Sequence, residues 1–235
     1  MLPNIIAESV AGCVGGVCKS AALYPLDLAT TRRELGLAAF EDGAPLVERY
    51  YRGLGVCILL LPLYAVVFHG AYVASSANDL VGSTLGSLAA SVVGAPSECA
   101  KKRVQLGAAP TAALAGGRSL FDGYGAILVR NVPYNAVNFC AFRLLRGPPA
   151  LRGFLAGCLT AVVTHPIDVA LTRIQTARHR DLSPEPALRT LRHVFAARTF
   201  FRGLLVRLLN YAPASLIFFA VFDPTRHFLL RLLLS

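Results

Sequence analysis

The sequence predicts an all-α membrane protein with six transmembrane helices in three two-helix units, and three observations lead to this fold class. First, the chain of 235 residues is 55% hydrophobic and only 15% charged, which is unusually apolar for a soluble domain. Second, residues 53–78 and 80–97 carry no charged side chain, and each run can cross a hydrocarbon core of roughly 30 Å as a helix. Third, the sequence repeats itself three times. A soluble helical protein with long buried helices is the alternative.

One repeated pattern is a proline, an acid two residues later and an arginine seven residues after the proline. It occurs in "LYPLDLATTRREL", "SVVGAPSECAKKRVQLG" and "THPIDVALTRIQT". Small residues precede the three prolines in one register, as the pairs Gly12 and Gly16, Ser83 and Ser87, and Gly153 and Gly157. Because such pairs let helices approach closely in a membrane, the pattern indicates three equivalent helices.

A second pattern begins each intervening helix. In "YRGLGVCILLLPLYAVVF", "FDGYGAILVRNVPYNAVNF" and "FRGLLVRLLNYAPASLIFF", an aromatic residue, a charged residue and a glycine precede a proline, and a phenylalanine follows six residues after that proline. The two patterns alternate along the chain. We therefore expect three repeats, at 1–76, 77–147 and 148–235, within a single transmembrane domain.

These patterns place the helices in order along the chain. The predicted spans are 4–34, 53–76, 80–106, 123–146, 151–178 and 203–231. An even number of spans puts both termini on one side of the membrane. The long connection at 179–202 contains "PEPALRTLRHVFAAR", which follows a Ser-Pro turn and is predicted to form a short amphipathic helix on the membrane surface.

Charge and cysteine usage argue against several functions. The net charge is +10, but the basic residues follow the apolar segments or lie in connections, so we expect one basic membrane side and no nucleic-acid partner. The six cysteines form no CxxC pair and no ligand spacing with histidine, so no metal site is expected. No His, Cys or acid cluster has catalytic spacing, which argues against an enzyme with catalytic residues. The N-terminal "MLPNIIAESV" shows no cleavable targeting signal.

The two patterns resemble the signature of the mitochondrial carrier family. That signature is Pro-x-acid-x-x-base-x-base at the end of each odd-numbered helix and aromatic-base-Gly at the start of each even-numbered one. The resemblance covers nearly the whole chain. It implies six tilted helices around a central cavity, a multi-pass monomer in the mitochondrial inner membrane, and alternating access between two gates. Each proline is expected to bend its helix, which brings three charged helix ends together.

The resemblance implies a matrix gate in which the acid of one repeat pairs with the base of the next. The acids are present as Asp27, Glu98 and Asp168. The positions of the bases hold Thr30, Lys101 and Leu171. By the family's pairing, only the pair of Asp27 with Lys101 is therefore expected to remain, and Lys101 should carry most of whatever gate remains. Compensation by Thr30, Lys102 or nearby arginines is the alternative.

The implied cytoplasmic gate has the pattern aromatic-acid-x-x-base near the ends of the even-numbered helices. It is also reduced: Asp223, Arg226 and Arg146 are kept, whereas Arg143 replaces an acid. An ordinary interface charge is the alternative for Arg143 and Arg146.

The resemblance further implies bound cardiolipin, and no other cofactor. The corresponding positions are the glycines that open the even-numbered helices, Gly53, Gly123 and Gly203. Free N–H groups at helix N-termini suit a phosphate. Simple helix capping is the alternative at these positions.

Substrate contacts in the family lie shortly before the prolines of both helix types. The matching positions here are Leu59, Leu60, Arg130, Asn131, Asn210, Tyr211, Ser20, Ser91 and Ala161. An arginine within the membrane marks a functional site, and its guanidinium suits a carboxylate or phosphate. Because the sequence "RNVP" offers Arg130 no adjacent carboxylate, we interpret Arg130 as a substrate ligand rather than a structural cation. Leu59 and Leu60 would form an apolar wall or simply pack, and Tyr211 would offer a surface to a base.

Within the family, several stretches are most similar to the S-adenosylmethionine carriers. They are "AALYPLD", "APSECAKKR", "FDGYGAILVRNVPYNAVNFCAFRLLR" and "LTAVVTHPIDVALTR". The similarity implies exchange of S-adenosylmethionine for S-adenosylhomocysteine, with Arg130 on the substrate carboxylate. Those carriers tend to have acids where this chain has Ser20 and Asn131. The alternatives are a carrier of another nucleotide- or carboxylate-containing metabolite, and a carrier-derived membrane protein that forms a pore or does not transport.

Overall fold

The structure, a computed structural model, describes residues 2–40, 43, 45–75, 79–115, 117–147 and 149–234. In these residues the chain forms helices and no strand. The long helices are α1 (Leu2–Glu34), α3 (Leu54–Ala74), α4 (Asp79–Gln105), α6 (Tyr124–Leu144), α7 (Pro149–Thr176) and α9 (Leu204–Leu234). They coincide with the predicted spans apart from a few residues at the ends, which confirms the fold class.

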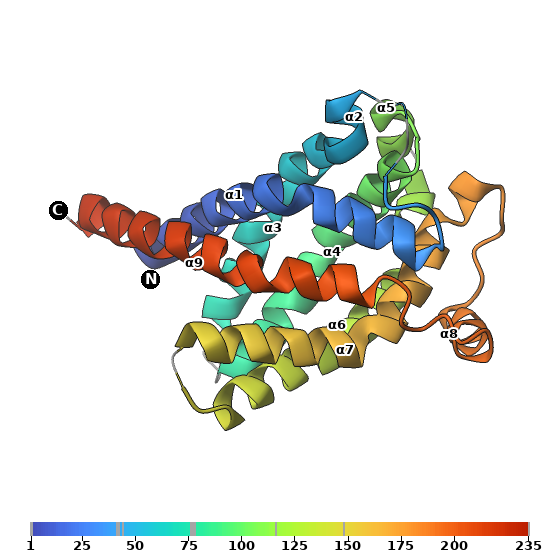
Figure 1. The fold of residues 1–235 in the computed structure, drawn as a ribbon. Coiled ribbons are helices and arrows are strands. Elements are labelled where there is room, and N and C mark those ends of the chain that lie inside the picture. Colours follow the sequence, from blue (N-terminus) through green and yellow to red (C-terminus); the bar gives the residue numbers. More distant parts are fainter. Residues whose placement is uncertain are drawn as a thin grey trace.

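Short helices connect the long ones. They are α2 (Leu46–Tyr51), α5 (Pro110–Leu114), η1 (Gly117–Phe121), η2 (Arg178–Arg180) and α8 (Ala187–Ala196). The predicted amphipathic helix is α8, whose Val194 packs into a buried cluster with Val169 and Ala170 of α7. The two termini lie together at one end of the molecule, and α8 lies at the opposite end (Figure 1).

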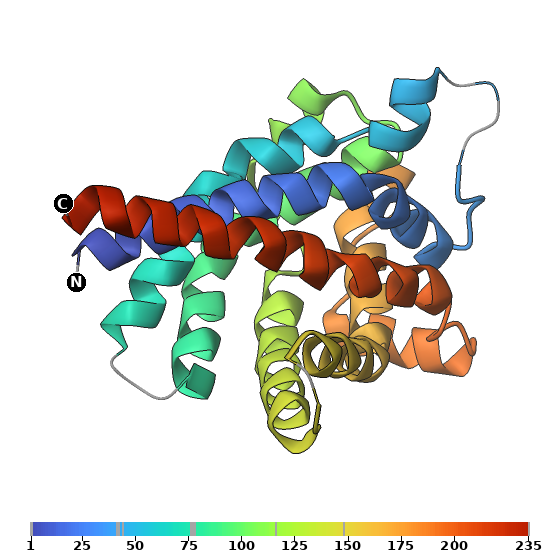
Figure 2. The ribbon, with the colours of Figure 1, turned by 60° about the vertical axis from the view of Figure 1, so that its left-hand side comes forward.

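The long helices form a closed ring. Each contacts two neighbours, in the order α1, α3, α4, α6, α7, α9 and back to α1. In addition, α1, α4 and α7 contact one another directly, so these three helices converge. Each contains a proline of the first repeated pattern, Pro25, Pro96 or Pro166, and α1 visibly changes direction in its last turns (Figure 2). A proline removes one helical hydrogen bond and bends the helix.

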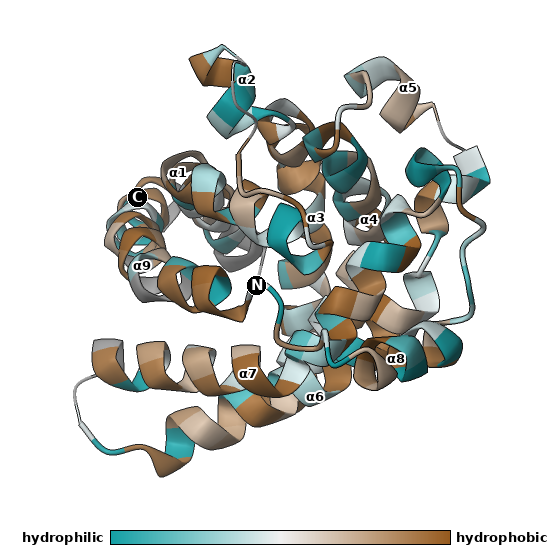
Figure 3. Ribbon diagram, turned by 45° about the vertical axis from the view of Figure 1, so that its right-hand side comes forward, coloured by the Kyte–Doolittle hydropathy of each residue, from teal (hydrophilic) through white to brown (hydrophobic). Residues whose placement is uncertain are grey.

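Several segments of the ring qualify as membrane spans by length and apolar composition. They are Ile6–Glu34, Leu46–Ala74, Leu80–Gln105 and Leu151–Thr176. Helices α6 and α9 have 21 and 31 residues, and about 20 residues suffice to cross the hydrocarbon core. Hydrophobic residues run along α7, and hydrophilic residues are frequent around α8 (Figure 3). The outer surface of the ring is therefore suited to lipid.

Glycines allow the helices of the ring to approach closely. A Cβ on Gly12 would lie 2.8 Å from Cε1 of His69, and a Cβ on Gly16 would lie 2.9 Å from Cδ2 of Leu61. Both neighbours belong to α3. The first pair of small residues therefore marks the contact between α1 and α3, as its spacing predicted.

Candidate substrate cavity and gates

The ring encloses a cavity of about 450 Å³. Its polar lining residues are Lys19, Ser20, Tyr24, Asp27, Thr30, Thr31, Glu34, Tyr64, Ser97, Glu98, Lys101, Lys102, Arg130, Tyr134, Asp168, Thr172, Arg207 and Asn210. The four acids come from the convergent ends of α1, α4 and α7, as do Lys101 and Lys102, and Arg130 and Arg207 reach them from α6 and α9. The cavity therefore ends at a floor of charged side chains.

The structure places the predicted substrate residues in three different surroundings. Ser20, Leu60, Arg130 and Asn210 line the cavity. Ser91 and Asn131 lie between α4 and α6, where Nδ2 of Asn131 donates a hydrogen bond of 2.8 Å to Oγ of Ser91. Both side chains are buried, so they bind each other across the helix interface instead of facing the cavity.

Leu59 lies on the outer face of α3, which differs from the prediction. Its side chain is 64% exposed, on the same helix face as the exposed Leu63, whereas Leu60 and Tyr64 line the cavity. The inward face of α3 passes through Leu60, Leu61 and Tyr64. Because successive residues of an α-helix are about 100° apart around its axis, this orientation turns Leu59 outwards. The side chain of Tyr211 lies outside the described part of the chain.

The pair of Asp27 with Lys101 forms as the repeat pattern predicts. Nζ of Lys101 lies 3.0 Å from Oδ2 of Asp27. Nε2 of Gln105 donates a hydrogen bond of 2.9 Å to the same oxygen and contacts the hydroxyl of Tyr24 at 3.2 Å. This ion pair ties α1 to α4 at the floor of the cavity.

The expectation that this is the only remaining pair is wrong. Nη1 of Arg207 lies 2.7 Å from Oδ2 of Asp168, and Nη1 of Arg130 lies 3.1 Å from Oδ1 of Asp168. Nη2 of Arg130 lies 3.6 Å from Oε1 of Glu98. The other two acids of the gate are thus paired by arginines of α6 and α9, and Arg130 does have carboxylate neighbours, from helices distant in the sequence.

The two positions without a base are filled in other ways. The hydroxyl of Thr30 donates to the carbonyl oxygen of Leu26 in its own helix at 2.8 Å. Leu171 is fully buried and packs against Ala95, Ala126 and Ile127. Neither residue has an ionic role in the described part of the chain. Arg130 and Arg207 occupy that role instead.

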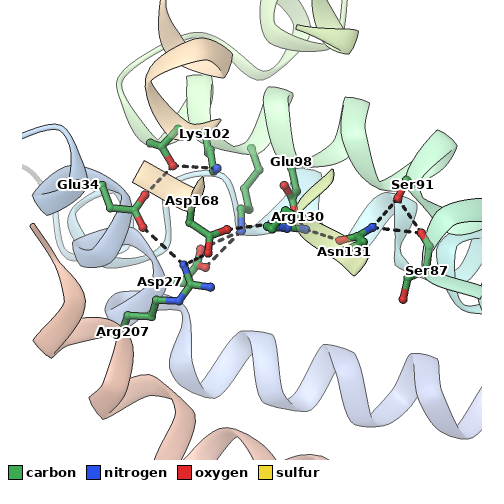
Figure 4. Close-up of polar contacts among 12 residues, drawn as sticks. Asp27, Glu34, Ser87, Ser91, Glu98, Lys102, Arg130, Asn131, Asp168 and Arg207 are labelled. Atoms are coloured by element: carbon green, nitrogen blue, oxygen red, sulfur yellow. Dashed lines mark hydrogen bonds and ion pairs between the residues drawn. The ribbon is translucent and has the colours of Figure 1, made fainter. Parts of the chain in front are cut away.

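Glu34 adds a further acid to the floor. The hydroxyl of Thr172 donates to Oε2 of Glu34 at 2.5 Å, and Nζ of Lys102 donates to Oγ1 of Thr172 at 2.9 Å. Nη1 of Arg207 lies 3.9 Å from Oε1 of Glu34. These contacts link α1, α4, α7 and α9, so with the Asp27 pair they hold the convergent helix ends together (Figure 4).

The predicted cytoplasmic-gate residues are not brought together. Nη2 of Arg226 lies 3.1 Å from Oε1 of Glu8, an acid of α1. Asp223 and Arg146 are exposed, and Arg146 follows the end of α6. Arg143 lies over the ring of Phe139, with its guanidinium carbon 4.6 Å from the ring centroid. The only ion pair of this group within the described residues is therefore that of Arg226 with Glu8, which the pattern did not include.

The glycines at the predicted lipid positions have backbone conformations that explain their identity. Gly53, Gly123 and Gly203 have φ of 94°, 81° and 84°, values that L side chains rarely adopt. A Cβ on Gly123 would lie 2.8 Å from Cδ1 of Leu171. Capping and close packing therefore account for these glycines, and lipid binding at them stays a prediction.

The chain matches the family model described as "Mitochondrial carrier protein" over residues 149–232. It is 30% identical to "S-adenosylmethionine carrier 1, chloroplastic/mitochondrial" of Arabidopsis thaliana, over 92% of this chain and 77% of the relative. It is 28% identical to "Probable S-adenosylmethionine carrier 2, chloroplastic" of the same plant, over 96% and 75%. It is 26% identical to "Mitochondrial S-adenosylmethionine carrier protein" of Xenopus tropicalis, over 96% and 97%.

A closed ring of membrane-spanning helices around a polar cavity, together with these relatives, defines a membrane transport protein for a small molecule. The chain belongs to the mitochondrial carrier family. The family and the mitochondrial relatives also confirm the predicted multi-pass location in the mitochondrial inner membrane.

Proposed function

We propose that the protein exchanges S-adenosylmethionine for S-adenosylhomocysteine across the membrane by alternating access. The observation that carries this proposal is the similarity, over more than nine tenths of the chain, to relatives that are named S-adenosylmethionine carriers. The cavity of about 450 Å³ is within the range of roughly 300–1,000 Å³ that is typical of sites for molecules of this size. We propose a carrier activity and no enzymatic one.

Arg130 is the proposed ligand of the substrate carboxylate. Its side chain reaches the cavity from α6 and is 18% exposed. A carboxylate that binds this guanidinium competes with Asp168 and Glu98 for the same charge. Binding would therefore weaken contacts that hold α4 and α7 to α6. A ligand shifts a conformational equilibrium only through such differential contacts, so this competition would couple substrate binding to opening of the floor.

A carrier of an anionic nucleotide or carboxylate is the second candidate. The lining contains five cations, Lys19, Lys101, Lys102, Arg130 and Arg207, and four acids, Asp27, Glu34, Glu98 and Asp168. The excess of one positive charge favours an anion or a zwitterion over a ligand with a net positive charge. S-Adenosylhomocysteine is such a zwitterion, whereas S-adenosylmethionine carries an additional sulfonium charge.

We further propose that the protein is a monomer with cardiolipin bound at the starts of α3, α6 and α9. Gly53, Gly123 and Gly203 have positive φ immediately before these helices, and the first N–H groups of a helix, which have no partner within it, can bind phosphate. Native mass spectrometry of protein purified with and without added cardiolipin tests both parts, because it reports the mass of the protein and of any retained lipid.

A thermal-shift screen of the purified protein tests the substrate. A ligand that binds the folded state raises the apparent melting temperature, so S-adenosylmethionine and S-adenosylhomocysteine are expected to raise it and ATP or citrate to do so less. The shift should be lost in Arg130→Ala. It should persist in Arg143→Ala, which removes an exposed arginine of the same helix. A larger shift with ATP or citrate would favour the second candidate.

A further inference from the structure

Glu98 is incompletely paired compared with the other acids of the matrix gate. Its ion pair with Arg130 is 3.6 Å long, whereas Asp27 and Asp168 have partners at 3.0 and 2.7 Å. Oε2 of Glu98 has no hydrogen-bond partner among the residues that the structure describes. The side chain lines the cavity and is 33% exposed. Its two oxygens exchange by rotation about the last torsion, so Glu98 can present an acceptor to the cavity.

The repeat pattern gives the cause of this incomplete pairing. The base that would face Glu98 is replaced by Leu171, which is fully buried in an apolar cluster with Ala126 and Ile127. The equivalent base of the second repeat, Lys101, remains and pairs with Asp27. The loss of the base thus leaves Glu98, among the residues that the structure describes, with the shared guanidinium of Arg130 as its one ion pair within 4 Å, while Lys102 and Lys101 act on it from farther away.

Arg130 offers a donor that complements this acceptor. Its Nη atoms contact Asp168, Glu98 and Asn131, and its Nε is buried, so a ligand carboxylate would bind the Nη atoms in competition with these acceptors. An α-amino acid carries a carboxylate and an ammonium group on one carbon. Glu98 can therefore accept a hydrogen bond from the ammonium group while Arg130 donates to the carboxylate.

The surroundings of Glu98 suit such a head group on a larger molecule. The ring of Tyr64 lies over Gly94, one helical turn before Glu98, where a Cβ would be 3.2 Å from the ring. Tyr134 lies one turn after Arg130 and also lines the cavity. Aromatic faces attract cations and provide apolar contact area for a nucleoside.

We infer that Glu98 binds the α-ammonium group of the substrate while Arg130 binds its carboxylate, so that this pair of side chains selects molecules with a free α-amino acid head. This inference rests on the proposed function and assigns Glu98 a role in binding besides its place in the gate. It also supplies the acid that Ser20 and Asn131 do not, since Asn131 is occupied with Ser91 in the helix interface.

Isothermal titration of the purified full-length protein with three ligands tests the inference. S-Adenosylmethionine and S-adenosylhomocysteine carry the head group, and 5′-methylthioadenosine has the same nucleoside without it. Glu98→Gln preserves the shape of the side chain and is expected to weaken binding of the first two ligands by about tenfold or more, the usual effect of losing a hydrogen bond to a charged group. Binding of 5′-methylthioadenosine should not change.

Two further variants serve as controls. Glu185→Gln makes the same change at an exposed acid that lies outside the cavity lining and outside both gates, and it should leave all three affinities unchanged. Glu98→Asp keeps the carboxylate on a side chain that is shorter by one methylene, and it should retain more affinity for the first two ligands than Glu98→Gln does.

The outcomes separate this inference from the proposed function. Wild-type affinity for S-adenosylhomocysteine in Glu98→Gln, or an equal loss for 5′-methylthioadenosine, would overturn the inference and leave the proposed substrate intact. Absence of binding of all three ligands by the wild-type protein would instead overturn the proposed function, and the inference with it.

Discussion

Replacing Arg207 by alanine is predicted to destabilise the floor of the cavity more than replacing Lys101. Arg207 lies 2.7 Å from Asp168, and the two side chains are 14% and 6% exposed. Lys101 lies 3.0 Å from Asp27, which is 36% exposed and keeps its hydrogen bond from Gln105. Truncation of Arg207 therefore leaves the more deeply buried carboxylate, which keeps Arg130 as its remaining ion-pair partner.

The expected magnitudes follow from the burial of the two pairs. Removing one partner of a buried ion pair costs about 3–5 kcal/mol, because the other charge stays buried. Arg130 remains 3.1 Å from Asp168 and offsets part of this loss, so we expect about 2–3 kcal/mol for Arg207→Ala. For Lys101→Ala we expect about 1 kcal/mol, the upper end for partly exposed pairs. At about 2–4 °C per kcal/mol for a chain of this size, the melting temperature should fall by about 4–12 °C and 2–4 °C, respectively.

Thermal unfolding of the detergent-purified variants, followed by intrinsic fluorescence of the tyrosines, measures both shifts under one condition. Arg207→Lys is the matched control, since it keeps the charge and loses the planar guanidinium, and its shift should be smaller than that of Arg207→Ala. A larger fall for Lys101→Ala than for Arg207→Ala would refute the reasoning. It would show that the pair of Asp27 with Lys101 carries the gate, as the repeat pattern alone suggests.

Three further changes test the packing and the orientation of the helices. Gly123→Ala should destabilise the protein by about 1–3 kcal/mol, because the φ of Gly123 is 81° and the added Cβ meets the side chain of Leu171. Gly125→Ala is the control: its Cβ meets nothing within 4 Å, so it should be neutral or stabilising in the same melting experiment. Arg103→Lys should cost about 1–3 kcal/mol, since the buried guanidinium donates to the carbonyl oxygens of Gln175 and Ser119 and pairs with Asp122, and lysine can replace only part of these contacts; chemical denaturation checks this. Leu60→Asn should slow transport in liposomes without reducing the yield of folded protein. Leu59→Asn, on the outer face, should reduce the yield of folded protein without slowing transport by the protein that folds.

Much of the fold could be predicted because its signals are local. Prolines and glycines act on the backbone at their own positions, so the repeats of Pro25, Gly53 and their counterparts gave helix boundaries within a few residues. The first repeated pattern, together with the pairing that the family resemblance implies, also identified the contact between Asp27 and Lys101.

The remaining contacts depend on how each helix is rotated and on residues far away in the sequence. Arg130 has no carboxylate near it in the chain, but α7 brings Asp168 to 3.1 Å. Arg207 was visible as an isolated charge in an apolar span, which is a signal for an interior partner, but the partner was not. Glu34 could have been found by comparing the repeats, because it occupies the register of Gln105 and Gln175, nine residues after each proline.

Counter-exchange in reconstituted liposomes tests the central claim most directly. Liposomes that contain the protein and S-adenosylhomocysteine are mixed with radiolabelled S-adenosylmethionine, and uptake is followed with time. The structure and the relatives predict saturable uptake that requires internal substrate, is lost in Arg130→Ala and persists in Arg143→Ala. Uptake that ignores the internal substrate and admits unrelated solutes, or no uptake by the wild-type protein at all, would contradict an alternating-access carrier of S-adenosylmethionine.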